Sequence, residues 1–442
     1  MLIAEACNPA WTSVPLVGFN MASAIAARPN LDVTLVTNAR NAADLAGSPL
    51  ADAADVQFID TERISGPLYR LGAKLRGGAS LGWTTAMALA WPGYVAFEHA
   101  VAKRFGPALH RGEFDLIHRL TPLSPALPSP LAGRFDVPFA IGPINGGLPW
   151  PKDYPELRSR EREWLSPLRG AVRHLPYWKR TFRRADGILT ASGSAEAGLP
   201  SRCDAVRLRF PENGIDPERF PIADGWTPPA AGQPFTFVSV GRLVPLKAFD
   251  VVLEALAKLD DDSRLVLIGD GPERKPLLAL ASRLGVAERV AFRGWMDQHE
   301  VARDLAAAQA FVFPSLREFG GGVVLEAMAA GLPSVVVNYG GPGELVSDAT
   351  GIRVPMAARA ELVSSVAEAM QTLRTKPDVA AAMGTAAAAE VRTRHTWTAK
   401  AARIAAFYAD VLRQAGRPLP SGFPAVPDPH LATPEPIASP CP

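Results

Sequence analysis

The sequence is poor in cysteine and has no long apolar run, and each shortage excludes a class of protein. Its 442 residues include three cysteines, Cys7, Cys203 and Cys441, none in a CxxC pair. This spacing argues against a disulfide framework and against a structural zinc site. The least polar stretch, residues 81–97, is interrupted by glycine, threonine and proline. It falls short of the ~20 apolar residues that a membrane-spanning helix needs.

The sequence also has no large excess of positive or negative charge. The 46 Lys and Arg and the 44 Asp and Glu give a formal net charge of +2. The chain as a whole therefore lacks the basic charge that is typical of nucleic-acid-binding proteins. The start, MLIAEACNPAW, has no basic segment and too short an apolar one for a secretory signal. We therefore expect a cytoplasmic protein, at most peripheral on the inner face of the plasma membrane.

The sequence does contain a regular alternation of short apolar strands and amphipathic helices. This pattern is typical of α/β layers around parallel sheets. Strands are predicted at 33–37, 115–118, 138–142, 187–192, 235–241, 264–271, 289–295, 310–315 and 333–337. A Pro/Gly-rich connector at 223–234 predicts a domain boundary. We expect two doubly wound, Rossmann-like domains, 1–222 and 223–398, facing across a cleft, and a disordered Pro-rich tail at 416–442.

One stretch, SLREFGGGVVLEAMAAGLP (315–333), places Glu318 and Glu326 on either side of three glycines. Eight residues at ~100° each would separate the two side chains on a single helix, so Glu318 is predicted in a loop and Glu326 in the following helix. A glycine loop before a helix N-terminus favours anion binding, and carboxylates beside it suggest a ligand with phosphate and hydroxyl groups. The alternative is an ordinary connection with two surface glutamates.

Other strand ends in this half carry related signals. Arg242 follows a strand and Lys247 comes five residues later, before a predicted helix, which suits a diphosphate. LIGDGPER and VNYGGPGELV add two glycine-rich strand exits. Each alone has an alternative interpretation, since glycine-rich turns follow most strands in such sheets.

Together these blocks resemble the nucleotide-sugar-binding domain of GT-B glycosyltransferases of family GT4, the group 1 retaining enzymes. The similar segments are VGRLVPLKAFDVVLEAL, LVLIGDGPERKPLLALASRLGVAERVAFRGWM, AFVFPSLREFGGGVVLEAMAAGLPSVVV and YGGPGELV, with RRADGILTAS and PENGIDPERF. RHTWTAKAARIAAFYADVL is similar to the family's C-terminal helix, here 399–415, which returns to the first domain.

The resemblance implies a role for each matching residue. Arg242 and Lys247 would bind the donor diphosphate, Glu318 the sugar hydroxyls and Glu326 the ribose. Amides of the loop would cap sugar and phosphate, and the turn after FRGWM would line the base. The donor-binding set implied in this way, besides Glu326, is Phe319, Gly320, Gly321, Gly322, Gly241, Trp295 and Met296.

The first half matches a GT4 subgroup with departures. Val14 stands where that subgroup has glutamate and Leu16 where it has glycine, while Gly18 remains as a close-approach position of the donor-binding set. His118 lies where the family often has a histidine near the transferred sugar, which implies a catalytic role. The alternative is a structural histidine at a strand end.

The implied reaction moves a sugar from a UDP- or GDP-sugar to a saccharide or lipid-linked acceptor, in cell-surface polysaccharide or glycolipid synthesis, with retained configuration. Two alternatives stay open: a catalytically silent nucleotide-sugar-binding subunit, favoured by Val14 and Leu16, and a GT-B sugar-nucleotide epimerase. No cofactor and no essential metal are expected. Asp260, Asp261 and Asp262 are interpreted as a solvated turn rather than a magnesium site.

Residues 150–184 are basic and aromatic. They carry a net charge of +6 with His174 neutral, and Trp150, Trp164, Tyr177 and Trp178 are interleaved with the cations. This composition is typical of a surface that binds anionic lipid headgroups. The alternative is a solvated helix with paired Glu and Arg side chains.

Overall fold

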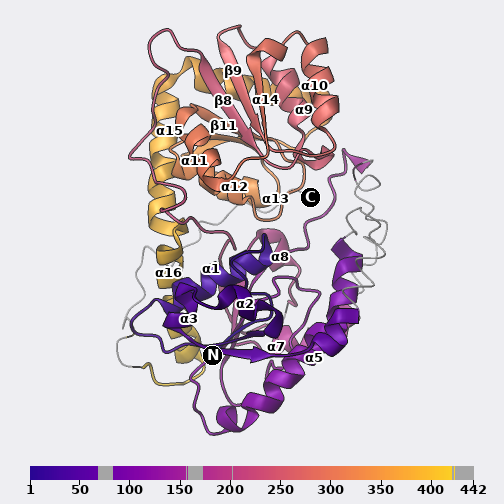
Figure 1. The fold of residues 1–442 in the computed structure, drawn as a ribbon, viewed down its shortest axis with the longest axis vertical. Helices are drawn as coiled ribbons and strands as arrows, with labels where there is room; N and C mark the ends of the chain where they lie inside the picture. The colour runs from indigo at the N-terminus through magenta and orange to yellow at the C-terminus, as the bar shows by residue number, and fades with distance from the viewer. Residues whose placement is uncertain (68–82, 156, 158–172, 202, 421–422, 424–442) are drawn as a thin grey trace. The chain divides into compact units, whose positions relative to one another are not determined.

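The computed structural model describes residues 1–67, 83–155, 157, 173–201, 203–420 and 423. The chain divides into two compact units, and Figure 1 shows their elements. Unit 1 contains Met1–Gly147, Glu161–Glu212 and Lys400–Pro442, and unit 2 contains Leu148–Arg160 and Asn213–Ala399. Residues 156 and 158–172 of the basic stretch 150–184, and most of the predicted tail 416–442, therefore lie outside the described residues.

Unit 1 is a parallel α/β unit. Within the described residues its sheet has seven strands in the order β3-β2-β1-β4-β5-β6-β7. They are β1 (Leu2–Ala4), β2 (Thr34–Asn38), β3 (Asp55–Ile59), β4 (Ile117–Thr121), β5 (Phe139–Ile144), β6 (Gly187–Thr190) and β7 (Val206–Arg209). The helices are α1 (Val14–Ala26), α2 (Ala42–Leu45), α3 (Pro49–Ala53), α5 (Trp83–His110), α7 (Trp178–Arg184), α8 (Gly193–Ala197) and α16 (Trp397–Gln414), the last from Lys400 on.

Three strands of unit 1 were not predicted from the sequence, because their patterns are too short to interpret. β1, β3 and β7 were not expected, although β1 lies between β2 and β4 in the sheet. Leu2, Ile3 and Ala4 are buried because both faces of a parallel sheet are covered by helices. The apolar start of the chain is therefore a central strand of this sheet. The strand expected at 115–118 begins two residues later, at Ile117.

Unit 2 has the strand order of a dinucleotide-binding sheet. In the continuous described stretch 203–420, six parallel strands pair in the order β10-β9-β8-β11-β12-β13. They are β8 (Phe235–Val240), β9 (Ser263–Ile268), β10 (Val290–Gly294), β11 (Ala310–Phe313), β12 (Ser334–Val337) and β13 (Gly351–Val354). The helices are α9 (Phe249–Leu256), α10 (Arg274–Arg283), α11 (Gln298–Ala307), α12 (Gly322–Ala329), α13 (Gly340–Leu345), α14 (Arg359–Thr375) and α15 (Pro377–Glu390), followed by the π-helical turn Val391–His395.

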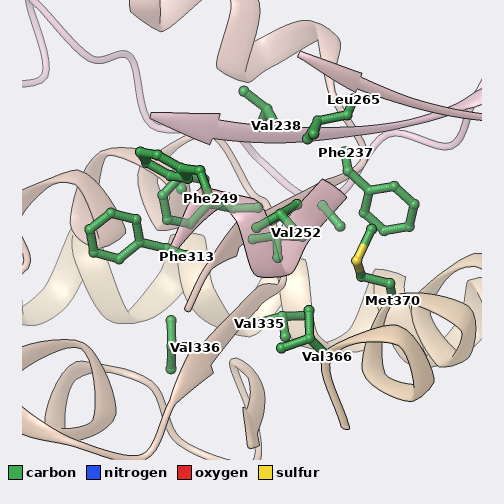
Figure 2. Close-up of a cluster of buried hydrophobic side chains, with 14 of the residues drawn as sticks. Phe237, Val238, Phe249, Val252, Leu265, Phe313, Val335, Val336, Val366 and Met370 are labelled. Carbon is green, nitrogen blue, oxygen red and sulfur yellow. The ribbon is translucent and has the colours of Figure 1, made fainter. Parts of the chain in front are cut away.

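Aromatic and branched side chains from strands and helices form the core of unit 2. Figure 2 shows Phe237 of β8 and Phe313 of β11 in one cluster with Val252 of α9 and Met370 of α14, all of them buried. The ring of Phe313 also lies 6.3 Å from that of Phe249, centroid to centroid. This packing fixes the ends of β8 and β11, from which the functional loops start.

The division between the units differs from the expected boundary at residue 222. Residues 213–222 belong to unit 2 because the backbone N–H of Ile215 donates to His395 and both Ile215 and Phe220 are in the unit 2 core. The connector 223–234 also packs on unit 2, since the indole N–H of Trp226 donates to the carbonyl of Gln309 at 2.7 Å. Among the described residues, no helix is both long and apolar enough to cross a membrane.

Candidate functional site

The candidate site lies at the point in unit 2 where the strand order reverses. β8 and β11 are neighbours in the sheet, and their chains continue in opposite directions across it. Ligands of doubly wound sheets bind at the carboxyl ends of strands at such a switch point. The loop that follows β8 starts at Gly241 and leads into the 3-10 helix Pro245–Lys247, and the loop Pro314–Gly321 follows β11. The two predicted clusters of functional residues therefore lie on adjacent strand ends.

A cation and a carboxylate meet between these loops. The Nζ of Lys247 donates to Oε2 of Glu318, and the two side chains are 17% and 25% exposed. Lys247 also lies over the ring of Phe313, with its Nζ 4.8 Å from the centroid. The loops are joined through the backbone as well, because the N–H of Leu316 donates to the carbonyl of Leu246 at 2.9 Å. The structure thus brings together two residues that the sequence separates by 71 positions.

Glycines let the neighbouring strand exits pack backbone against backbone. A Cβ added to Gly269 would lie 2.0 Å from the carbonyl oxygen of Gly241, and one added to Gly340 would lie 2.3 Å from that of Glu318. Gly340 has a φ of +64°, and the next residue, Gly341, donates its N–H to the Glu318 carbonyl at 3.0 Å. The glycine-rich exits therefore support the Glu318 loop, a function that only residues without a Cβ can fulfil here.

Glu326 lies in α12, as expected, and Glu318 in the preceding loop. Gly321 caps the helix in the left-handed conformation, with a φ of +62°, and Gly322 packs beside Asn213. Burial raises the pKa of the half-buried Glu326 carboxyl from its ordinary value of 4.5 to about 7. A carboxylate that gains hydroxyl donors would recover this desolvation cost. A carboxyl in this environment suits a ligand that brings hydroxyl donors.

The remaining donor-binding candidates of unit 2 follow three different strands, β8, β11 and β10. Arg242 is exposed directly after β8, Phe319 is half-buried, and Gly320 is buried. Trp295, after β10, is 79% exposed, whereas Met296 packs partly on the core. Their roles in donor binding stay predictions.

One residue of this site was not expected from the sequence. Arg317 is 8% exposed and stacks between the rings of Trp150 and Phe319. Its position directly before Glu318 was the only available signal, because Trp150 is far away in the chain.

Two candidates lie in unit 1. His118 is fully buried, with one ring nitrogen 2.6 Å from the Tyr408 hydroxyl and the other 2.9 Å from the Gly142 carbonyl. Burial lowers its pKa to about 3, so the ring is neutral. These contacts favour the structural interpretation, and the catalytic role stays an untested prediction. Gly18 packs on the Ala6 carbonyl, which lies 2.4 Å from where a Cβ would be.

The acidic trio forms ion pairs at the far end of the unit 2 strands. Arg374 contacts Asp260 and Asp262, and Arg289 lies 3.4 Å from Asp261. This arrangement accounts for the three aspartates as the partners of two arginines. In the part of the chain that the structure describes, no three metal-ligating side chains converge.

The two parallel sheets are those of the GT-B fold. The family model described as "Glycosyl transferases group 1" matches residues 226–389. A D-inositol 3-phosphate glycosyltransferase of Streptomyces scabiei is 31% identical over 339 residues, which is 71% of either chain. The chain belongs to the group 1 glycosyltransferase family and is a glycosyltransferase.

One further relative and two solved structures are also similar to this chain. A GDP-mannose-dependent α-(1-6)-phosphatidylinositol monomannoside mannosyltransferase of Mycobacterium tuberculosis is 34% identical over 225 residues, covering 46% of this chain and 56% of that one. Sucrose-phosphate synthase from Thermosynechococcus elongatus has the same fold, with a TM-score of 0.64, 22% identity and coverage of 93% and 98%. HepE of Anabaena in complex with UDP aligns at a TM-score of 0.56, 19% identity and coverage of 91% and 97%.

Proposed function

We propose that this glycosyltransferase moves a sugar from a UDP- or GDP-sugar to a hydroxyl of a saccharide or lipid-linked acceptor, with retained anomeric configuration, in cell-surface polysaccharide or glycolipid synthesis. The observation that carries the proposal is the meeting of Lys247 and Glu318 at the switch point of the unit 2 sheet, with Glu326 on the helix that follows. A cation suits a diphosphate, and carboxylates suit hydroxyl groups. The UDP bound to the Anabaena neighbour supports a nucleotide-sugar donor.

Each of these side chains has a chemical reason for its proposed role. Lys247 has three N–H donors, so it serves Glu318 and a phosphate oxygen at the same time. Arg242 is exposed on the same loop and offers a planar fork to the diphosphate. Glu318, held in place by Lys247, accepts hydrogen bonds from sugar hydroxyls, and Glu326 accepts them from the ribose.

The proposed reaction is attack on the face from which the nucleotide leaves. The bond between the anomeric carbon and the phosphate oxygen breaks, a bond to the acceptor oxygen forms, and the acceptor proton passes to the departing phosphate. Negative charge grows on that phosphate, and Arg242, Lys247 and the N-terminus of α12 stabilise it. We propose that no metal ion takes part. Activity that disappears in EDTA and returns with magnesium would contradict this point.

The names of the relatives support an acceptor that is an inositol, a saccharide or a lipid conjugate. One surface of unit 1 fits a lipid-linked acceptor: α7 buries Trp178 and Phe182 and exposes Lys179, Arg180, Arg183 and Arg184. Such a cationic face is attracted to anionic headgroups.

Vesicle flotation tests this surface. We expect the wild-type protein to float with phosphatidylglycerol vesicles and the variant Lys179→Glu/Arg183→Glu to remain at the bottom. Lys376→Glu, an exposed change in unit 2, is the control for altered charge. Equal flotation of all three proteins, or none by the wild type, would contradict the membrane proposal.

The donor proposal is tested by a binding and turnover screen against UDP-, GDP- and ADP-sugars. We expect the wild type to bind one donor and to hydrolyse it slowly without acceptor, and Glu318→Ala to lose both activities. Glu361→Ala, which removes an exposed carboxylate from α14, is the matched control. Binding without turnover, even with lipid acceptors, would indicate the silent subunit. Isomerisation of the donor would indicate the epimerase.

A further inference from the structure

We propose that Arg317 is a positioning residue for the transferred sugar: it fixes Glu318 by binding the segment Leu148–Trp150 to the donor loop. This inference rests on the proposed function, because it assigns Glu318 to the sugar. It adds a specificity-determining group that does not itself contact the donor.

The guanidinium of Arg317 is enclosed by two aromatic rings. Its central carbon lies 4.3 Å from the centroid of the Trp150 ring and 4.6 Å from that of Phe319. The planar guanidinium group stacks on ring faces in a way that a lysine ammonium does not. With Arg317 8% exposed, the group is desolvated, which strengthens these contacts.

The same guanidinium binds a distant backbone segment. One terminal nitrogen donates to the carbonyl of Leu148 at 2.9 Å, and Nε lies 3.3 Å from the carbonyl of Pro149. The Tyr339 hydroxyl donates to the same Pro149 carbonyl at 2.9 Å. We call Arg317, Trp150, Phe319 and Tyr339 the aromatic clasp.

The clasp holds the backbone on both sides of Glu318. Arg317 and Phe319, the chain neighbours of Glu318, are stacked on each other, so neither end of the Glu318 backbone moves without separating this stack. The Glu318 carbonyl is held by the N–H of Gly341, two residues after Tyr339. The Glu318 carboxylate pairs with Lys247 beside the proposed sugar position.

If Arg317 were purely structural, its replacement would weaken the binding of nucleotide and sugar alike. If it positions Glu318, its replacement weakens the binding of the sugar alone. The nucleotide contacts proposed for Arg242 and Glu326 lie outside the clasp. The inference therefore predicts a loss of preference for the nucleotide sugar over the nucleotide, with binding of the nucleotide itself kept.

The test compares the Kd of UDP with UDP-glucose and of GDP with GDP-mannose by calorimetry, and uses the pair that the wild type binds. We expect Arg317→Lys to reduce the preference for the nucleotide sugar about tenfold, the value of one hydrogen bond to a charged group. Trp150→Ala should cause the same loss, and Trp150→Phe should restore most of the preference. Arg353→Lys, which replaces the β13 arginine that pairs with Asp348, is the matched control.

The outcomes separate the inference from the proposed function. A wild type that binds neither pair would refute the donor proposal, and the inference with it. A wild type that prefers the nucleotide sugar, with an Arg317→Lys variant that keeps this preference, would refute the inference alone. Equal weakening of nucleotide and nucleotide sugar in Arg317→Lys and Trp150→Ala would also refute it, because the arginine would then support only the fold.

Discussion

Replacing Glu326 by glutamine should make the protein more stable at neutral pH and less sensitive to pH. The Glu326 pKa rises from 4.5 to about 7 because burial disfavours the charged form. The folded protein then holds this proton more tightly than the unfolded chain does. Glu326 therefore costs stability progressively as pH rises from 4.5 to about 7, and the cost is complete above pH 7.

The magnitude follows from the two pKa values. One pKa step corresponds to about 1.4 kcal/mol, so the full linkage is about 3 kcal/mol, and partial exposure of the side chain reduces it to about 2 kcal/mol. For a unit of this size that difference shifts Tm by about 4 to 8 °C. We expect the Tm of Glu326→Gln to exceed that of the wild type by this amount at pH 8 and to approach it at pH 4.5.

The assay is thermal unfolding of both proteins at half-unit steps between pH 4.5 and 8. Because the two chains differ at one position, the pH dependence of their Tm difference reports Glu326 alone. Glu361→Gln, an exposed carboxylate of α14, is the control and should follow the wild type. A Tm difference that stays constant with pH would refute the assigned burial, and one that grows toward low pH would reverse its sign.

Three further predictions follow from the contacts. Arg242→Ala or Lys247→Ala should reduce turnover about 10²- to 10³-fold with an unchanged circular dichroism spectrum. Lys258→Ala is the control and should keep wild-type turnover. Near-normal turnover of Arg242→Ala or Lys247→Ala would contradict the role in stabilising the leaving group. Gly340→Ala forces a Cβ against the Glu318 carbonyl and should cost about 2 kcal/mol in urea unfolding, with weaker donor binding. His118→Ala should lower Tm, while kcat per folded molecule falls less than tenfold; a large loss of kcat at constant Tm would restore its catalytic role.

The elements of unit 2 were largely predictable from the sequence because the patterns that indicate them are local. Strand patterns between residues 235 and 337 placed β8 to β12 to within a few residues, and the glycines before VVLEAMA marked the start of α12. Local sequence also placed Glu318 in a loop and Glu326 in a helix, since glycine resists helix formation. These are properties of the backbone within a few residues of each position.

Unit 1 was less predictable because several of its strands are too short to show a periodic pattern of apolar residues. β1 has three residues, and its central place depends on pairing with β2 and β4, which lie more than 30 and more than 110 residues away. For His118, too, the sequence left two interpretations. Only the contacts with Tyr408 and Gly142 show that both ring nitrogens are occupied.

By itself, the sequence determined the α/β class, the resemblance to group 1 glycosyltransferases and the residue types at the candidate site, because these depend on local composition and spacing. The tertiary structure alone decided that Lys247 pairs with Glu318, that Trp150 stacks on Arg317, and that burial raises the pKa of Glu326. Each of these depends on a distance or a degree of burial. Such quantities are set by the packing of segments far apart in the chain.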